Sequence, residues 1–269
     1  MSDYARYERL QIEVSDHLAT VTLNRPEARN AIDHLMYEEL TRVFVDLARD
    51  DAVWAVLLRA AGDTFCVGGD VKGMKDRPAG DVAAAHQDVL EPSHARRLVH
   101  NILDCDKPMV CAINGHAVGL GALIALLSDI TVMSEEAKIG DTHVKIGLVA
   151  GDGSAAIWPL LVGPARAKEF LMLSRLLTGA EAVRVGLVNY ALPKAEVAAK
   201  ALELARQLAA GPTWAMRWTK LAVNKVLKHQ VNLVLDASFA LEMTTFLTAD
   251  HKEAVAAFIE KRTPKFTGK

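Results

Sequence analysis

Two stretches indicate how this chain folds: Thr64-Phe65-Cys66-Val67-Gly68-Gly69-Asp70-Val71-Lys72 and Ala112-Ile113-Asn114-Gly115-His116-Ala117-Val118-Gly119-Leu120-Gly121. Each contains a glycine-rich turn that follows an apolar, strand-like run and precedes a helix-like run. Such a turn leaves one or two backbone N–H groups without an internal partner, and free N–H groups at a helix start attract negative charge. Two such groups that converge on one point would form an oxyanion hole.

Strand and helix patterns on either side of these turns predict a layered α/β core. Residues 10–14 and 19–23 alternate or are β-branched around a short polar turn, which predicts a hairpin. Asp33 can cap a helix that runs to about residue 49. The remaining predicted elements are strands at 53–58, 108–113 and 130–133 and a polar helix at 81–104.

The pattern changes after Leu192-Pro193, where the sequence becomes almost wholly helical in period. We predict helices at 195–210, 212–228 and 231–262, with Gly211-Pro212 as a stop and restart. A small appendage cannot bury the apolar faces of these helices alone, so we expect them to pack between subunits. The predicted division is an α/β core at 1–194 and a helical oligomerisation region at 195–269.

Composition excludes several classes of protein. The chain has 269 residues, 51% of them hydrophobic, and 31 basic residues against 33 acidic ones. Such a balance argues against a protein that coats nucleic acid. Residues 109–133 are apolar, but polar residues and glycines interrupt them, so we expect buried elements and no membrane partner. Three cysteines without a CxxC spacing suit reduced thiols and a cytoplasmic location.

Four segments in order give the chain its resemblance to a known family. The two turns resemble those of the crotonase superfamily, the enoyl-CoA hydratases and isomerases. Residues 23–31 look like the family's first coenzyme A contact, residues 137–148 like its third segment, and residues 258–262 like its C-terminal signature. The resemblance covers about residues 7–265.

The resemblance implies a spiral of repeated ββα units with a C-terminal helical trimerisation region. It also implies a homotrimer or a dimer of trimers. The substrate would be an acyl-CoA, with coenzyme A as part of the substrate and no permanently bound cofactor or metal. No set of His, Cys and Asp residues has the ligand spacing of a zinc site.

Residue by residue, the resemblance assigns the hole donors to the backbone N–H groups of Gly69 and Leu120. Arg25 and Arg29 flank the first coenzyme A turn, although isolated arginines are more often solvated surface charges. Lys261 is similar to a family lysine that reaches a neighbour's coenzyme A. The full set of expected coenzyme A contacts is Arg25, Ala28, Arg29, Gly68, Gly69, Asp70, Val71, Lys72 and Lys261.

The acid–base positions depart from the family pattern. Hydratases of the family use two glutamates, and the corresponding residues here are Leu123 and His143. A carboxylate bonded to one nitrogen of His143 would fix its tautomer and raise its basicity. We expect Asp152 to be that partner, with Asp141 as the rival. The alternatives are a histidine satisfied in the core and an Asp152 that only forms a turn or caps a helix.

Three functions follow from these residues. The first is an enoyl-CoA hydratase or isomerase that uses His143 in place of glutamate. The second is a hydrolase of a β-diketone carbon–carbon bond or of a thioester, because Ala150-Gly151-Asp152-Gly153 looks like a turn found in such family members. The third is an acyl-CoA-binding homologue without catalysis, because both glutamates are missing.

Overall fold

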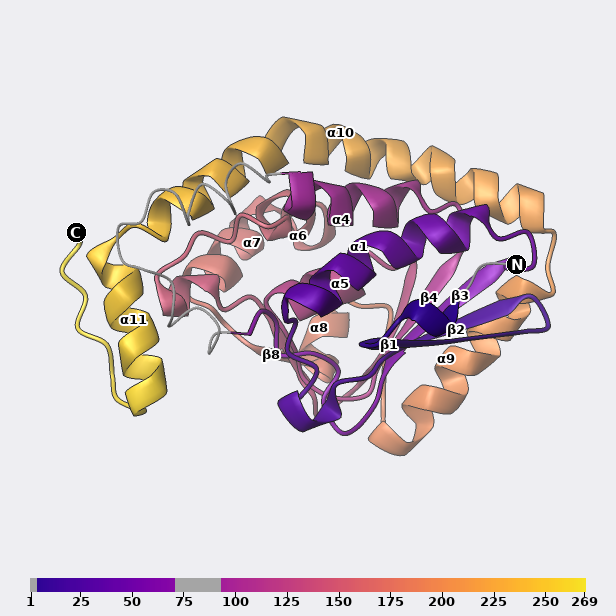
Figure 1. Cartoon of the computed structure of the whole chain (residues 1–269), viewed down its shortest axis with the longest axis horizontal. Helices are drawn as coiled ribbons and strands as arrows, with labels where there is room; N and C mark the ends of the chain where they lie inside the picture. The colour runs from indigo at the N-terminus through magenta and orange to yellow at the C-terminus, as the bar shows by residue number, and fades with distance from the viewer. Residues whose placement is uncertain (1–3, 71–92) are drawn as a thin grey trace.

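A six-stranded sheet lies at the centre of the fold in the computed structural model, which describes residues 4–70 and 93–269 (Figure 1). The strand order is β1-β2-β3-β4-β6-β9, and every pair is parallel except β1 with β2. The strands are β1 (Leu10–Ser15), β2 (Leu18–Leu23), β3 (Ala55–Ala60), β4 (Met109–Ile113), β6 (Ile130–Ser134) and β9 (Tyr190–Leu192). A second sheet has the order β5-β7-β8, formed by Ala117–Val118, Lys138–Gly140 and Leu177–Thr178.

The predicted hairpin is confirmed. β1 pairs with β2 from Leu10 opposite Leu23 to Ser15 opposite Leu18. Asp16 and His17 make the two-residue turn, and both have left-handed φ angles, of 49° and 63°. Turns with positive φ at both central positions match the twist of the flanking strands. The strands predicted at 53–58, 108–113 and 130–133 are also found, with bounds that differ by up to two residues.

Helices cover both faces of the large sheet. α1 (His34–Arg49) begins where predicted, because the Asp33 carboxylate accepts a hydrogen bond of 2.8 Å from the Met36 N–H. On the opposite face, α9 (Lys194–Ala209) packs against the sheet (Figure 1). Its buried stripe is Val197, Ala201, Ala205 and Ala209. Small residues along this stripe let the helix backbone approach the strands closely.

The remaining α-helices are α4 (Ser93–Asp104), α5 (Leu120–Leu126), α6 (Ser154–Val162), α7 (Pro164–Met172), α8 (Gly179–Arg184), α10 (Thr213–Thr245) and α11 (Ala249–Glu260). Short 3₁₀ turns lie at η1 (Tyr4–Arg6), η2 (Pro26–Ala28) and η3 (His143–Ile146). None of the helices in the described residues is both long and apolar enough to cross a membrane.

The predicted break between residues 228 and 231 is wrong. α10 is one continuous helix of 33 residues that runs along the whole length of the molecule (Figure 1). No glycine or proline interrupts Thr213–Thr245, so nothing in this segment opposes helical hydrogen bonding. The chain breaks instead before Thr248, whose side chain caps α11 by accepting a hydrogen bond from the His251 N–H. The division at residue 194 stays a prediction.

Part of the sequence interpretation lies outside the described residues. The helix predicted at 81–104 is seen only as α4 from Ser93 onward. Val71 and Lys72, two expected coenzyme A contacts, also lie outside the described part of the chain.

Candidate active site

The two glycine turns lie directly against each other. The Cys66 N–H donates to the His116 carbonyl at 3.0 Å, and the Val118 N–H donates to the Cys66 carbonyl at 2.9 Å. Gly68 follows with a φ of +85°. A Cβ atom on Gly68 would lie 2.9 Å from the Val118 carbonyl oxygen and 3.6 Å from the Leu120 nitrogen. Only glycine therefore allows this approach, which brings the Gly68-Gly69 turn onto the start of α5.

Two backbone donors lie on these adjoining turns. Leu120 is the first residue of α5, so its N–H has no partner within the helix. Gly119 precedes it with a φ of +56° and donates its own N–H to the Gly140 carbonyl at 2.9 Å. Within the described residues, neither the Gly69 N–H nor the Leu120 N–H donates a hydrogen bond to a backbone carbonyl. The pair can therefore bind an oxygen that carries negative charge.

His143 lies beside these turns and is bonded to Asp141. Its Nδ1 lies 2.9 Å and 3.0 Å from the two Asp141 carboxylate oxygens. The His143 N–H donates to the same carboxylate at 3.0 Å. The chain turns at Thr142 from β7 into η3, and this turn brings the two side chains to the same side. Asp141, the partner ranked second from the sequence, thus makes the Nδ1 contact.

Asp152 faces the other nitrogen of the imidazole. Its Oδ2 lies 3.5 Å from His143 Nε2, beyond normal hydrogen-bond length. The structure therefore brings His143 and Asp152 together, as the sequence interpretation expected, but with Asp141 on the opposite side of the ring. Asp152 also stabilises its own turn, which was the alternative role expected from the sequence. The Ser154 N–H donates to Asp152 Oδ1 at 3.4 Å.

Glu242 is the residue that the sequence interpretation missed. It lies on α10, and its Oε1 is 3.7 Å from His143 Nε2. A signal was present in the sequence, because Val231, Leu235, Ser238 and Glu242 form one buried stripe of the helix. A glutamate within such a stripe is almost never buried without a partner.

Close packing fixes Glu242 at this point. A Cβ atom on Gly151 would lie 2.3 Å from the Ser238 carbonyl oxygen and 2.6 Å from the Glu242 Cβ. The Ser238 hydroxyl donates to the Gly151 carbonyl at 2.8 Å. The Val149 N–H donates to the Thr245 hydroxyl at 3.2 Å. α10 is therefore held tightly against the Gly151-Asp152-Gly153 turn.

Burial and charge shift the pKa of every group in this cluster. Burial alone would lower the pKa of His143, but the charges of Asp152 and Asp141 raise it well above its ordinary value. Burial opposes ionisation of Asp141, yet His143 holds the pKa of that carboxyl below its usual range. Burial raises the pKa of Asp152, and burial with the Asp152 charge raises the pKa of Glu242 to about 8. The neighbouring carboxyl groups therefore favour the protonated form of the His143 ring.

Tyr37 on α1 belongs to the surroundings of this cluster. Burial raises the pKa of its phenol, and the charges of Asp152 and Glu242 raise it further. The ring therefore stays protonated throughout the ordinary pH range. Its phenol lies within electrostatic range of both carboxyl groups.

The two turns and the imidazole adjoin each other at Gly119. A Cβ atom on that glycine would lie 3.9 Å from both the Gly68 Cα and the His143 Cε1. A group bound at the two N–H donors would therefore lie next to the imidazole. This adjacency is what an acid–base reaction on a carbonyl compound requires.

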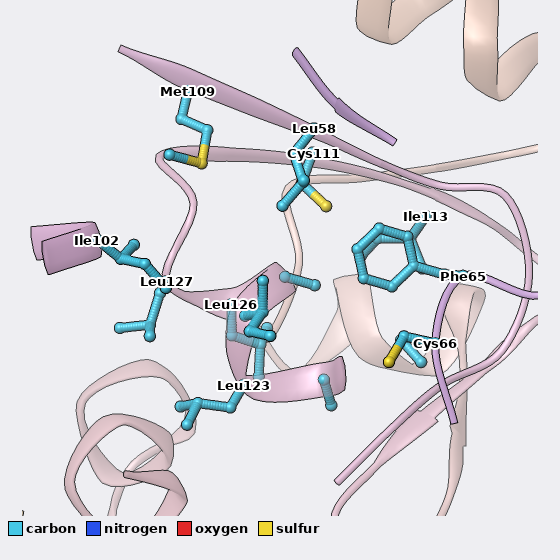
Figure 2. Packing of buried hydrophobic residues seen from close by; sticks show 14 of the residues in the cluster. Leu58, Phe65, Cys66, Ile102, Met109, Cys111, Ile113, Leu123, Leu126 and Leu127 are labelled. Carbon is cyan, nitrogen blue, oxygen red and sulfur yellow. The ribbon is translucent and has the colours of Figure 1, made fainter. Parts of the chain in front are cut away.

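Leu123 takes no part in proton transfer. It is fully buried on α5 and packs in the hydrophobic cluster with Leu126 and Leu127 (Figure 2). It also touches the turn that carries Asp152, since a Cβ atom on Gly153 would lie 3.0 Å from its side chain. The residue is thus a packing support with no group that could transfer a proton.

The expected coenzyme A contacts differ in burial and in bonding. Arg25 is partly buried and bonded, with Nη1 2.8 Å from the Ala31 carbonyl and 3.1 Å from Asp70 Oδ2. It therefore ties the first turn to the glycine turn and is not a solvated charge. Arg29 and Lys261 are exposed, both with left-handed φ angles of 54°, and Ala28 is half-buried.

One group of side chains has the spacing of metal ligands within the described residues. Donor atoms of Asp141, His143 and Asp152 all lie within 4.8 Å of one another. The two carboxylates, however, face opposite nitrogens of the imidazole.

Comparisons with known proteins give one consistent result. The family model described as enoyl-CoA hydratase/isomerase matches residues 13–269. The 1,2-epoxyphenylacetyl-CoA isomerase of Escherichia coli K12 is 32% identical over 259 residues, which cover 95% of this chain and 97% of that protein. The short-chain-enoyl-CoA hydratase of Clostridium acetobutylicum is 32% identical over 252 residues, 93% of this chain and 94% of that one. An enoyl-CoA hydratase structure from Mycobacterium avium subsp. paratuberculosis K-10 has a TM-score of 0.86 at 29% identity, covering 97% and 99% of the two chains.

Proposed function

The chain belongs to the enoyl-CoA hydratase/isomerase family, the crotonase superfamily, and is an enzyme of that family. From this premise we propose that it hydrates or isomerises an enoyl-CoA thioester, with His143 and Asp152 in place of the usual glutamates. The thioester oxygen binds to the N–H groups of Gly69 and Leu120. The single observation that carries the proposal is the contact of the two turns with each other and with the His143 ring at Gly119.

The hole stabilises the charge that develops during the reaction. Attack at the β-carbon, or loss of an α-proton, moves an electron pair onto the thioester oxygen. Two fixed N–H donors stabilise that oxygen without having to reorganise, and each such donor contributes roughly 3–4 kcal/mol to the transition state. The start of α5 adds the positive end of a helix dipole.

The acid and the base follow from the protonation of the cluster. Asp152 accepts a proton from water, whose oxygen then bonds to the β-carbon. The His143 imidazolium donates its Nε2 proton to the α-carbon as the enolate collapses. Asp152 then carries a proton and His143 is neutral, and transfer across the 3.5 Å between them restores the starting state. Positioned acids and bases of this kind contribute about 10²–10⁴ in rate.

Asp141 has a positioning role in this scheme. Its two contacts to Nδ1 hold the ring and leave Nε2 as the nitrogen that faces Asp152. A buried carboxylate at this position also stabilises the cationic ring. The dyad of the sequence interpretation thus becomes a chain of Asp141, His143 and Asp152.

Coenzyme A binds along the first turn in this proposal. Arg29 is exposed and has no ion pair among the described residues, so its guanidinium is available for a phosphate. Arg25 acts indirectly, because it holds Asp70 beside the Gly68-Gly69 turn. Lys261 follows α11, a helix whose His251 bonds the Ile146 carbonyl of η3 at 2.7 Å.

The test is incubation of the purified protein with crotonyl-CoA. Loss of the conjugated-thioester absorbance with gain of one water by mass supports hydration, and a shifted double bond in a longer enoyl-CoA supports isomerisation. Absence of both products, with intact binding of coenzyme A, counts against the proposal.

A second function, hydrolysis of a β-diketone or a thioester, is favoured by the placement of Asp152. The Ala150-Gly151-Asp152-Gly153 turn sets this carboxylate at the imidazole nitrogen that faces away from Asp141. Water activated there could attack a carbonyl carbon held in the hole. Release of free coenzyme A, or cleavage of a β-diketone that needs no coenzyme A, would support this function over the first.

The assembly is proposed to be a homotrimer or a dimer of trimers. α10 exposes Trp214, Trp218, Val226, Leu233 and Leu241, and all five side chains are large and apolar. Exposed apolar area of this extent on one helix is typical of a subunit interface. Mass measurement in solution at micromolar concentration tests it, and a stable monomer would contradict it.

A further inference from the structure

Two buried carboxyl oxygens in the cluster have unused hydrogen-bonding capacity. Asp152 Oδ2 and Glu242 Oε2 accept no hydrogen bond from any of the described residues. Glu242 is 5% exposed and Asp152 9% exposed, so bulk water satisfies neither of them. An unpaired buried acceptor destabilises the fold, because it has lost its hydrogen bonds to water and gained none in the protein. Two such atoms beside one imidazole therefore indicate a ligand that donates hydrogen bonds.

His143 does not satisfy these carboxylates. Its Nε2 lies 3.5 Å from Asp152 and 3.7 Å from Glu242, whereas an N–H···O bond spans 2.7–3.2 Å. Nε2 therefore faces both carboxyl groups without a hydrogen bond of normal length to either. The backbone of α10 at Glu242 is held on this side of the ring, because α10 packs on Gly151 too closely for any side chain there.

Resting on the function proposed above, we propose that Asp152 Oδ2 and Glu242 Oε2 bind the two hydrogens of the water molecule that is added to the substrate. A water molecule offers two donors, which matches two unpartnered acceptors. Its oxygen is then free to bond to the β-carbon while Asp152 takes one proton. Glu242 holds the second hydrogen and transfers none. This assigns the site to hydration of an α,β-unsaturated thioester rather than to migration of its double bond.

The proposal separates two reactions of the same site. Hydration requires the bound water. Exchange of an α-proton requires the hole, with His143 first passing its Nε2 proton to Asp152 and then taking the α-proton, and it needs no water between the two carboxyl groups. Replacement of Glu242 should therefore lower hydration of crotonyl-CoA and leave α-deuterium exchange of butyryl-CoA in D₂O within a few-fold of the wild type. Glu242→Leu removes the acceptor and should slow hydration by about 10²-fold or more. Glu242→Gln keeps one acceptor oxygen and should retain more activity.

Asp236→Asn is the matched control, because Asp236 lies on the same helix but is exposed and paired with Arg96. It should change neither reaction. Equal loss of hydration and exchange in Glu242→Leu would overturn the proposal, since Glu242 would then act only by orienting His143. Unchanged hydration in Glu242→Leu, or a stoichiometric divalent cation in the purified enzyme, would overturn it as well.

Failure of the underlying function gives a different result. In that case the wild-type enzyme performs neither hydration nor α-exchange. If the wild-type enzyme exchanges the α-proton but hydrates no enoyl-CoA, the proposed roles of the hole and of His143 stand. Only the proposed water site is then overturned.

Discussion

Gly68→Ala is the substitution that tests the contact between the two turns most sharply. Its new Cβ would lie 2.9 Å from the Val118 carbonyl oxygen, where ordinary contact begins at 3.4 Å. One turn must therefore move by about 0.5 Å, the difference between these two distances. Hole donors work at 2.7–3.1 Å from the oxyanion, so such a shift amounts to the loss of a donor. We expect kcat for crotonyl-CoA hydration to fall by about 10²–10³, equivalent to roughly 3–4 kcal/mol.

Gly163→Ala is the control for backbone strain. Gly163 has a φ of +80°, close to the +85° of Gly68, but its Cβ would meet nothing within 4 Å. Both variants should lose roughly 1–3 kcal/mol of stability from the positive φ. Only Gly68→Ala should lose activity. Thermal denaturation and steady-state kinetics on both proteins measure the two effects, and a Gly68→Ala enzyme with kcat within five-fold of wild type would refute the reasoning.

Three further predictions concern the cluster and the first turn. Asp141→Asn removes the charge beside Nδ1, so the pKa of His143 should fall, and a pH–rate profile should show the high-pH limb moving to lower pH with kcat down roughly 10²-fold. Burial raises the pKa of Glu242 from 4.5 to about 8, so between these pH values the folded state holds a proton that the unfolded state has released. The unfolding free energy should therefore fall as the pH rises through this window. Denaturant titrations at several pH values should show a shallower fall for Glu242→Gln than for the wild type. Arg29→Ala should raise KM for the acyl-CoA without changing Tm, whereas Arg25→Ala should lower Tm because it releases Asp70 and the Ala31 carbonyl; equal effects on KM and Tm in the two variants would contradict this division of roles.

Local signals in the sequence were sufficient for most of the fold. The hairpin of β1 and β2 and the start of α1 depend on neighbouring residues, so a polar turn and the Asp33 cap predicted them correctly. The end of the long C-terminal helix was harder to predict. A break was expected near residue 229, but Thr213–Thr245 contains no residue that opposes helix formation. The cap that starts the next helix is Thr248, further along the chain.

The candidate site could be predicted only in part, because its residues come from distant segments. His143 and Asp152 were found from motifs, and the structure places them 3.5 Å apart. Asp141 was ranked second because spacing along a strand does not reveal the turn at Thr142. Glu242 reaches the site through tertiary packing of α10 on Gly151, and only its place in a buried helical stripe could have indicated it.

The most direct test of the central claim compares His143→Ala with the wild type for turnover and for binding. The claim is that the imidazole transfers the proton while the backbone hole and the first turn bind the thioester. Kinetics with crotonyl-CoA and calorimetric titration with a saturated acyl-CoA measure the two properties on the same protein. The account predicts that turnover is abolished while the Kd for the acyl-CoA stays within a few-fold of the wild-type value. Unchanged turnover in His143→Ala would contradict it.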